Sequence, residues 1–280
     1  MGATEVALEI EELSLVEAGA GLALSDEAGW NQTLEDWRYF LAQGTVFGMR
    51  DGEDRLIATA ALLPSPPVTW ISMVLVTANW RRRRLANALM TRCIDTAREH
   101  GLEPWLDATP AGAAVYQAMG FAETGLGLAR LRRTSDGSKA QRKQTPSTAS
   151  LQKLLDADRR TIGFDRGDLI QHFAARAASS LYETDAAIAL VRSGRKARQI
   201  GPVYADGQRA AIELFDCILD EESGSLIIDL SAAHSEAHEF LLSRGFVFER
   251  PFSRMRFGDG APKAIGGNAE LTAVIGPEFG

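Results

Sequence analysis

The sequence predicts an α/β fold made of two related domains, each a mixed, mostly antiparallel and twisted sheet flanked by helices. Three observations predict it. Strand and helix patterns alternate along the chain, the second half repeats the pattern of the first, and a polar stretch separates the halves. With 280 residues, 45% of them hydrophobic, the chain is long enough to bury two cores.

The first repeat, residues 1–133, starts with antiparallel strands and continues as strands that alternate with helices. Its patterns predict strands over 7–13, 45–50, 56–63, 68–76, 104–109 and 127–133, and helices over 34–42, 85–97 and 110–120. The turn "DGED" joins the second strand to the third as a hairpin. Thr109 is suited to cap the last helix because Pro110 follows at its first position.

The second repeat, residues 151–280, aligns with the first at a nearly constant offset. "VTANWRRRRLANALMTRCI" from Val76 aligns without a gap with "IGPVYADGQRAAIELFDCI" from Ile200, an offset of 124 residues. The later Gly-Phe pairs, at Gly120 and Gly245, have an offset of 125 residues. We interpret this as a duplicated domain, whose final segment "ELTAVIGPEFG" forms a short strand and a turn. Residues 134–150 contain almost no apolar residues and are predicted to be a linker.

Charge and composition exclude several classes of protein. A net charge of −7 argues against a dedicated nucleic-acid binder, whose domain is normally basic. No apolar stretch approaches the ~18 residues of a membrane-spanning helix, and the acidic N-terminus lacks the pattern of a signal peptide. Cys93 and Cys217 both fall at apolar positions of predicted helices, so we expect two buried thiols in a cytoplasmic protein.

Four consecutive arginines, Arg81–Arg84, are a local exception in this acidic chain. Such a run is a solvated surface, a nucleic-acid patch or a site for an anion. It lies between a predicted strand and a predicted helix, where backbone N–H groups and the positive end of the helix converge on one point. This position favours an anion site, and phosphates are the usual occupants of such sites.

Two motifs resemble those of the GNAT N-acyltransferase superfamily. The first is Val76-x-x-x-x-Arg81-x-x-Arg84-x-Ala86, and the second is "YQAMGF", which starts at Tyr116. The resemblance covers roughly residues 7–133 and implies a GNAT-like fold for both repeats, with acetyl-CoA as co-substrate and an amine as acceptor. It implies that the residues that bind acetyl-CoA are Val74, Leu75, Val76, Arg81, Arg82, Arg83, Arg84, Leu85, Ala86 and Asn87.

The same resemblance implies two catalytic roles. Tyr116 protonates the departing CoA thiolate, and a positioned acid of this kind accelerates such a step by ~10²–10⁴. The alternative for Tyr116 is a core aromatic that closes the sheet. No histidine stands in the core of the first repeat, so Ser72, with backbone carbonyls and a water, is the candidate for removing the proton of the amine.

Arg84 departs from the family pattern, which has glycine at that position. If the backbone there is helical, its side chain adds a contact to phosphate. If the backbone needs a positive φ, the substitution weakens CoA binding, because only glycine adopts that conformation without cost. Thr77 and Ala78 also replace the proline of the pattern.

The second repeat is predicted to be a degenerate copy. At the offset of 124, the four arginines correspond to "ADGQ", so that Asp206 stands where a phosphate would bind, and like charges repel. Aligned at the Gly-Phe pairs, Tyr116 corresponds to Leu241. His234 and His238 lie four residues apart, but without further ligands we expect surface histidines and no metal.

The second half also resembles, more loosely, the C-terminal half of two-domain bacterial GNAT proteins, through "DADRRTIGFDRGDLI", "RSGR" and "IGPVYA". That resemblance implies that the second domain packs against the first and forms a wall of the pocket for the acceptor amine. Asp158, Asp165 and Arg166 are then candidates for binding the substrate amine. The alternative for these three residues is helix capping and an interdomain ion pair.

These observations lead to one hypothesis and two alternatives. The first is a cytoplasmic N-acetyltransferase, monomeric or homodimeric, that moves the acetyl group of acetyl-CoA to a primary amine. A small molecule is favoured as the acceptor, although a polyamine, amino acid, aminoglycoside-like drug or protein lysine all fit. The second is an acyl-CoA-binding sensor or pseudoenzyme without turnover. A nucleic-acid-binding module is the weakest, because the net charge is negative.

Overall fold

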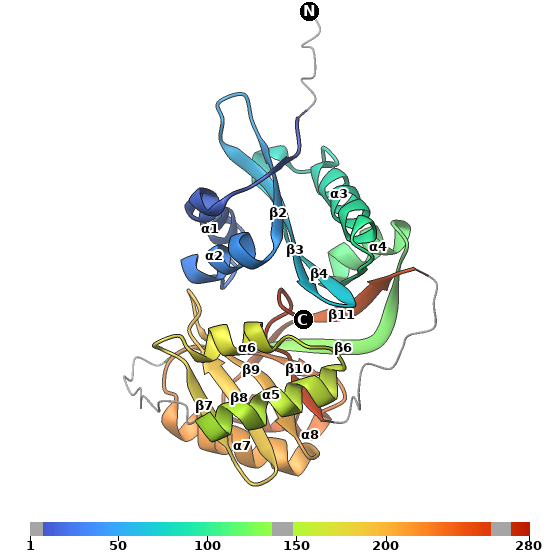
Figure 1. Cartoon of the computed structure of the whole chain (residues 1–280). Coiled ribbons are helices and arrows are strands. Elements are labelled where there is room, and N and C mark those ends of the chain that lie inside the picture. Colours follow the sequence, from blue (N-terminus) through green and yellow to red (C-terminus); the bar gives the residue numbers. More distant parts are fainter. Residues whose placement is uncertain (1–7, 136–147, 259–269) are drawn as a thin grey trace, which may run out of the picture. The chain divides into compact units, whose positions relative to one another are not determined.

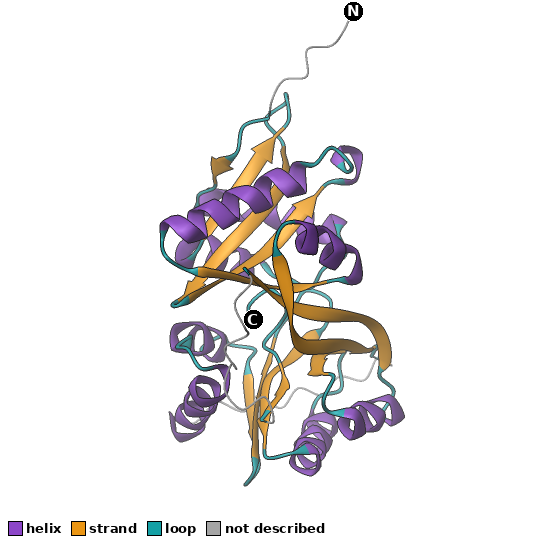
Figure 2. Cartoon of the chain, turned by 90° about the vertical axis from the view of Figure 1, so that its right-hand side faces the viewer, coloured by secondary structure: helices purple, strands orange, loops and turns teal. Residues whose placement is uncertain are grey.

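The computed structural model describes residues 8–135, 148–258 and 270–280. The chain divides into two compact units, Met1–Pro104 and Trp105–Gly280. Both units are built from strands with helices packed on their faces (Figures 1 and 2). Within the described ranges, no helix is both long enough and apolar enough to cross a membrane.

The first unit is an antiparallel sheet in the order β1-β2-β3-β4, with α1 and α2 on one face and α3 on the other (Figure 1). Its elements are β1 (Glu11–Glu12), η1 (Leu15–Glu17), α1 (Ala18–Glu27), α2 (Leu34–Gln43), β2 (Thr45–Arg50), β3 (Leu56–Ser65), β4 (Val68–Val76), η2 (Ala78–Trp80) and α3 (Leu85–Glu99). The predicted ranges of β2 and β4 are confirmed to the residue, and the hairpin turn joins β2 to β3 as expected.

The sequence did not predict helix α1, whose two glycines lower helix propensity. Tertiary packing on α2 explains why it forms. A Cβ atom on Gly21 would lie 2.4 Å from the ring of Trp37, so only glycine allows this approach. The indole of Trp37 also donates a 2.9 Å hydrogen bond to the Ser25 hydroxyl of α1. Helix α2 itself begins with a capping box in which Thr33 and Asp36 satisfy each other's backbone N–H groups.

The second unit is a sheet in the order β5-β11-β6-β10-β12-β9-β8-β7, with helices on both faces (Figure 2). Its elements are β5 (Glu103–Ala108), α4 (Pro110–Ala118), β6 (Phe121–Arg133), α5 (Thr148–Ile162), α6 (Gly167–Ala174), β7 (Ser180–Glu183), β8 (Ala187–Arg192), β9 (Arg198–Ala205), α7 (Gln208–Glu221), β10 (Leu226–Ser231), α8 (Ser235–Ser243), β11 (Val247–Phe257) and β12 (Leu271–Ala273). The predicted cap of α4 is confirmed, since Thr109 accepts a hydrogen bond from the Gly112 N–H.

The two repeats exchange their last strands. Strand β6, which ends the first repeat, pairs with β10 of the second, and β11, which ends the second repeat, pairs with β5 of the first. The two exchanged strands also pair with each other. Because of this exchange, the two compact units do not coincide with the predicted domains, 1–133 and 151–280. Those domain limits describe the two sequence repeats and stay a prediction. Most of the predicted linker, 134–150, lies outside the described residues, and its last three residues belong to α5.

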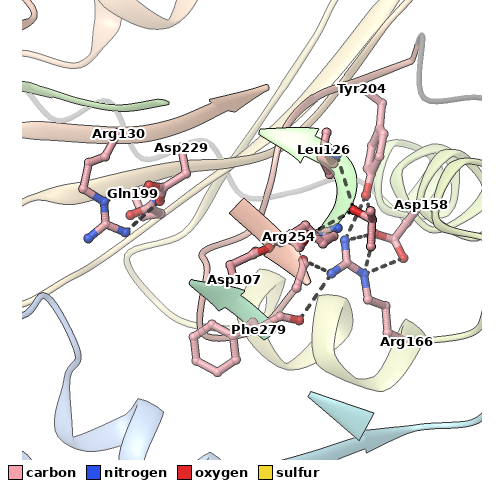
Figure 3. A network of polar contacts seen from close by, with 12 residues as sticks. Asp107, Leu126, Arg130, Asp158, Arg166, Gln199, Tyr204, Asp229, Arg254 and Phe279 are labelled. Carbon is pink, nitrogen blue, oxygen red and sulfur yellow. Dashed lines mark hydrogen bonds and ion pairs between the residues drawn. The ribbon is translucent and has the colours of Figure 1, made fainter. Parts of the chain in front are cut away.

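Two reciprocal ion pairs join the exchanged strands. The Arg130 guanidinium of β6 donates two hydrogen bonds, of 2.7 and 2.8 Å, to the Asp229 carboxylate of β10. The Arg254 guanidinium of β11 donates two hydrogen bonds of 2.9 Å to the Asp107 carboxylate of β5. In each pair the two residues face each other in the strand register, and all four are buried or nearly so (Figure 3). Burial acts to lower the pKa of Arg130, but the Asp229 carboxylate more than offsets this and raises it overall.

Substitution of Arg254→Leu tests this arrangement. It leaves the Asp107 carboxylate buried without its partner, so we expect the free energy of unfolding to fall by about 3–5 kcal/mol. Arg209→Ala is the matched control, because it removes an exposed pair with Glu213 and should cost below ~0.5 kcal/mol. Urea denaturation of both variants provides the comparison, and equal midpoints would contradict a structural role for the buried pair.

Candidate functional site

One cavity of about 490 Å³ lies in the first unit, where β4 passes into α3. It is lined by Ala28, Trp30, Val74, Leu75, Val76, Trp80, Arg81, Arg82, Arg84, Leu85, Ala86 and Asn87. Nine of the ten residues predicted to bind acetyl-CoA are therefore brought together. The exception is Arg83, whose guanidinium lies 4.6 Å from the centre of the Trp80 ring.

A bulge in β4 shapes the wall of this cavity. Met73 has a φ of +52°, and the pairing with β3 shifts register at this point. The Thr59 hydroxyl stabilises the bulge by donating a 2.9 Å hydrogen bond to the Met73 carbonyl. Because a bulge re-aims the residues that follow it, the last three residues of β4 line the cavity, although Leu75 and Val76 stay paired with β3. The hydroxyl of Ser72, directly before the bulge, is buried and has no hydrogen-bond partner among the described residues.

The arginine loop has two residues in the left-handed region, Arg82 with a φ of +64° and Arg84 with a φ of +61°. Arg84 is the N-cap residue of α3, and its carbonyl accepts the first helical hydrogen bond, from the Ala88 N–H. The N–H groups of the first helical turn, Leu85–Asn87, therefore have no partner within the helix and border the cavity. The structure thus answers the question raised by Arg84: its backbone has the positive φ that favours glycine.

Helix α1 supplies the opposite wall of the cavity, which sequence reasoning missed. Ala28 and Trp30 follow its last turn and line the cavity. The Glu27 carboxylate accepts a 2.7 Å hydrogen bond from the Ala78 N–H, which ties the end of α1 to the loop after β4. On the loop side, the Arg81 guanidinium donates a 3.1 Å bond back to the Val76 carbonyl. These bonds fix the first half of the loop, from Val76 to Arg81.

Tyr116 lies on α4 in the second unit. Its side chain is half-buried, and its ring centre is 6.1 Å from that of Phe121. It is therefore not a fully buried core aromatic. Its catalytic role stays a prediction.

The predicted substrate residues Asp158 and Arg166 bind each other instead. Arg166 donates to both carboxylate oxygens at 2.8–3.1 Å, and the Tyr204 hydroxyl also donates to Asp158 (Figure 3). Both charged side chains are almost fully buried. Burial, with the neighbouring Asp158 charge, raises the pKa of Tyr204, which keeps its hydroxyl protonated.

Asp165 has a local role at the start of α6. It accepts 2.8 Å hydrogen bonds from the Gly167 N–H and the Arg159 guanidinium. These bonds lower the pKa of Asp165. Helix capping and ion pairing, the alternative weighed for Asp158, Asp165 and Arg166, thus describe most of their contacts, although the ion pairs are formed within the second unit. Arg166 also donates to the carbonyls of Phe279 and Gly280. None of the three lines the cavity.

Two further expectations need correction. His234 is not a surface histidine but is 3% exposed, and burial lowers its pKa. Cys217 is exposed, whereas Cys93 is buried and burial raises its pKa to about 12. Within the described ranges there is no group of three His, Cys, Asp or Glu side chains that could hold a metal ion.

The second repeat has no counterpart of the arginine loop. Strand β9 continues to Ala205 and α7 starts at Gln208, so two residues separate strand from helix, whereas Thr77–Arg84 separate β4 from α3. The gap-free alignment is therefore wrong at this point, because it matches the loop to residues that lie partly in β9. Between β9 and α7 a loop of that length is absent, not merely altered in charge.

Comparison with protein families matches each half of the chain separately. Residues 14–121 match the model described as acetyltransferase (GNAT) family, and residues 154–266 match the model described as acetyltransferase (GNAT) domain. A curated relative, the uncharacterized N-acetyltransferase YitH of Bacillus subtilis, is 24% identical over 238 residues, which cover 80% of this chain and 83% of that protein.

Solved structures share the fold over nearly the full length. A protein from Pyrococcus horikoshii described as an acetyltransferase superposes with a TM-score of 0.76 at 14% identity, covering 99% of this chain and 98% of that one. A tandem GNAT protein from the clavulanic acid biosynthesis pathway gives 0.61 at 15% identity, covering 89% and 98%. At these identities the likeness concerns the fold.

The left-handed backbone at Arg84 leads to a prediction that separates conformation from charge. Arg84→Gly and Arg84→Ala remove the same charge, but only glycine adopts a φ of +61° without steric cost. We expect the glycine variant to be more stable than the alanine variant by about 1 kcal/mol. Chemical denaturation measures this difference. An alanine variant at least as stable as the glycine variant would contradict a left-handed residue here.

Proposed function

Since the chain belongs to the GNAT acetyltransferase superfamily and carries two GNAT domains in tandem, we propose that it is an N-acetyltransferase. It moves the acetyl group of acetyl-CoA to a primary amine of a small molecule by direct transfer. The observation that carries this proposal is the cavity between β4 and α3, where nine residues expected to bind acetyl-CoA converge. Its volume of about 490 Å³ falls in the ~300–1,000 Å³ range of small-molecule sites.

The chemistry of the cavity suits a pyrophosphate. Its three lining arginines, Arg81, Arg82 and Arg84, supply positive charge, and no acidic residue lines it. The free N–H groups at the start of α3 add hydrogen-bond donors and the positive end of the helix. The last three residues of β4 offer backbone groups to the amides of the pantetheine arm, which then enters along the strand. Together these features support acyl-CoA more than a generic anion.

The proposed reaction is a single displacement at the thioester. The neutral amine attacks the carbonyl carbon, a C–N bond forms, and the C–S bond breaks to release the CoA thiolate. Tyr116 supplies the proton that the thiolate takes up. A water held by Ser72 and nearby carbonyls accepts the proton that the amine loses, which the buried and unpartnered Ser72 hydroxyl supports.

The second repeat is proposed to be a non-catalytic partner. It has Leu241 in place of the tyrosine, and two residues, Asp206 and Gly207, in place of the loop. Its role is to complete the exchanged sheet. We further propose a cytoplasmic protein, monomeric or homodimeric, that uses neither a metal nor nucleic acid.

The alternative is an acyl-CoA-binding sensor or pseudoenzyme. Two observations favour it: no carboxylate or imidazole lines the cavity to act as a base, and Arg84 stands in a conformation suited to glycine. A screen of amines that reads released CoA thiol separates the two functions. The exposed Cys217 contributes a background of one thiol per chain, which a Cys217→Ser variant removes.

Acetyl-CoA binding is the first test. Isothermal titration of the intact protein should show binding, and Arg82→Glu should weaken it at least about tenfold, because a like charge then faces the pyrophosphate. Arg209→Glu on the exposed face of α7 is the matched charge reversal and should leave the affinity unchanged. No binding to the wild-type protein would overturn both the enzyme and the sensor.

Tyr116→Phe tests the acid. The ring and its contact with Phe121 are preserved while the proton donor is lost. We expect kcat to fall by about 10²-fold or more, with the affinity for acetyl-CoA changed much less. Steady-state kinetics with an amine found in the screen, together with titration, measure both quantities. A parallel loss in affinity and kcat would assign Tyr116 a structural role instead.

A further inference from the structure

Strands β9 and β10 of the second unit start as parallel neighbours and then separate. They pair directly over three positions, from Leu226 opposite Arg198 to Ile228 opposite Ile200. Beyond that point strand β12 lies between them. Ala273 faces Leu230 of β10 on one side and Val203 of β9 on the other. A slot between diverging strands is therefore filled by the chain itself.

The fit of β12 in this slot is close. The Val274 N–H donates to the Asp229 carbonyl at 3.1 Å, and the Ala205 N–H donates to the Glu270 carbonyl at 3.0 Å. All three residues of β12 are at most 2% exposed. At the apex, a Cβ atom on Gly201 would lie 2.0 Å from the Val274 carbonyl oxygen, so the absence of a side chain at this position is what admits the strand.

Side chains of the second unit hold both ends of this segment. Before β12, the Glu270 carboxylate accepts hydrogen bonds from Arg160 and Thr161 of α5. After it, the buried Arg192 donates to the Ile275 carbonyl at 3.1 Å and pairs with Glu278. Because both ends are anchored, β12 belongs to the folded sheet and is not a loose covering.

We propose that β12 occupies, in the second repeat, the position that the pantetheine arm of acyl-CoA takes in the first, so that each chain binds one acyl-CoA. In the first repeat, the last three residues of β4 line the proposed acyl-CoA cavity. In the second, β12 pairs with Val203 and Tyr204, two of the last three residues of β9. An extended strand and a pantetheine arm both present amides to a strand edge, so one excludes the other. The part of this inference that concerns acyl-CoA binding in the first repeat rests on the proposed function.

Titration and hydrogen exchange on the intact protein test it. Coenzyme A should bind with a stoichiometry of one per chain and slow amide exchange over residues 74–87, while exchange over residues 271–274 stays slow with or without it. In the Arg82→Glu variant, which weakens the site in the first repeat, titration should detect no second site that binds coenzyme A more tightly. Two molecules per chain, or a change in exchange at 271–274 on binding, would overturn the proposal.

A second arm does not depend on CoA. Gly201→Ala places a methyl group on the Val274 carbonyl and should accelerate exchange over residues 271–274 by about tenfold or more, because the strand is pushed from the slot. Gly245→Ala is the matched control, since Gly245 also has a positive φ but has open space at its Cβ position. Equal exchange in the two variants would overturn the closed slot.

The two arms separate the possible failures. Absence of any CoA binding defeats the proposed function. The comparison of Gly201→Ala with Gly245→Ala then tests by itself whether β12 fills the slot. If Gly201→Ala does not fold, amide exchange over residues 271–274 in the wild-type protein still tests whether β12 is a permanent strand. Amides of 271–274 that exchange as slowly as those of 226–228 support a permanent strand, and amides that exchange as fast as exposed loops overturn it.

Discussion

The reciprocal pairing of Arg130 with Asp229 and of Arg254 with Asp107 is the constraint on which the second unit depends. Each pair joins the last strand of one repeat to a strand of the other. The carboxylates are fully buried, and a buried charge without its partner costs several kcal/mol. Both repeats carry this aspartate and this arginine on equivalent strands, so each exchanged strand brings an arginine that pairs with the aspartate of the other repeat. The ion pairs therefore add to the hydrogen bonds between strands in holding the exchanged arrangement.

This constraint gives the second repeat a structural role that is independent of any ligand. The second repeat has a two-residue turn where the first has the arginine loop, and its slot between β9 and β10 holds β12. Its core nevertheless remains closely packed, with β8, β9 and α7 contributing many fully buried residues. A repeat that supplies Asp229 and receives β6 contributes to stability whether or not it binds a ligand.

Local features were predictable from the sequence because local chemistry decides them. The hairpin turn indicated β2 and a continuous apolar run indicated β4, while Thr109 and Pro110 indicated the start of α4. The position of the arginine run between strand and helix led to the cavity. Strand partners were not predictable, because the alternation that defines β6 is the same whichever neighbour it pairs with. The gap-free alignment also concealed the missing loop, since "IGPVYADGQ" has the length of the loop sequence but continues as a strand.

The arginine loop combines charge with backbone strain. Arg82 and Arg84 both adopt a positive φ, which costs a residue with a side chain about 1–2 kcal/mol each. Such strain persists only where surrounding contacts hold it, and here the bonds from Arg81 to Val76 and from Ala78 to Glu27 hold the residues that lead into the left-handed positions. The loop places three exposed arginines and the N–H groups of the first turn of α3 around one cavity. Under the proposed function, a pyrophosphate meets a loop whose backbone is already left-handed at these two residues, so binding does not have to supply that strain.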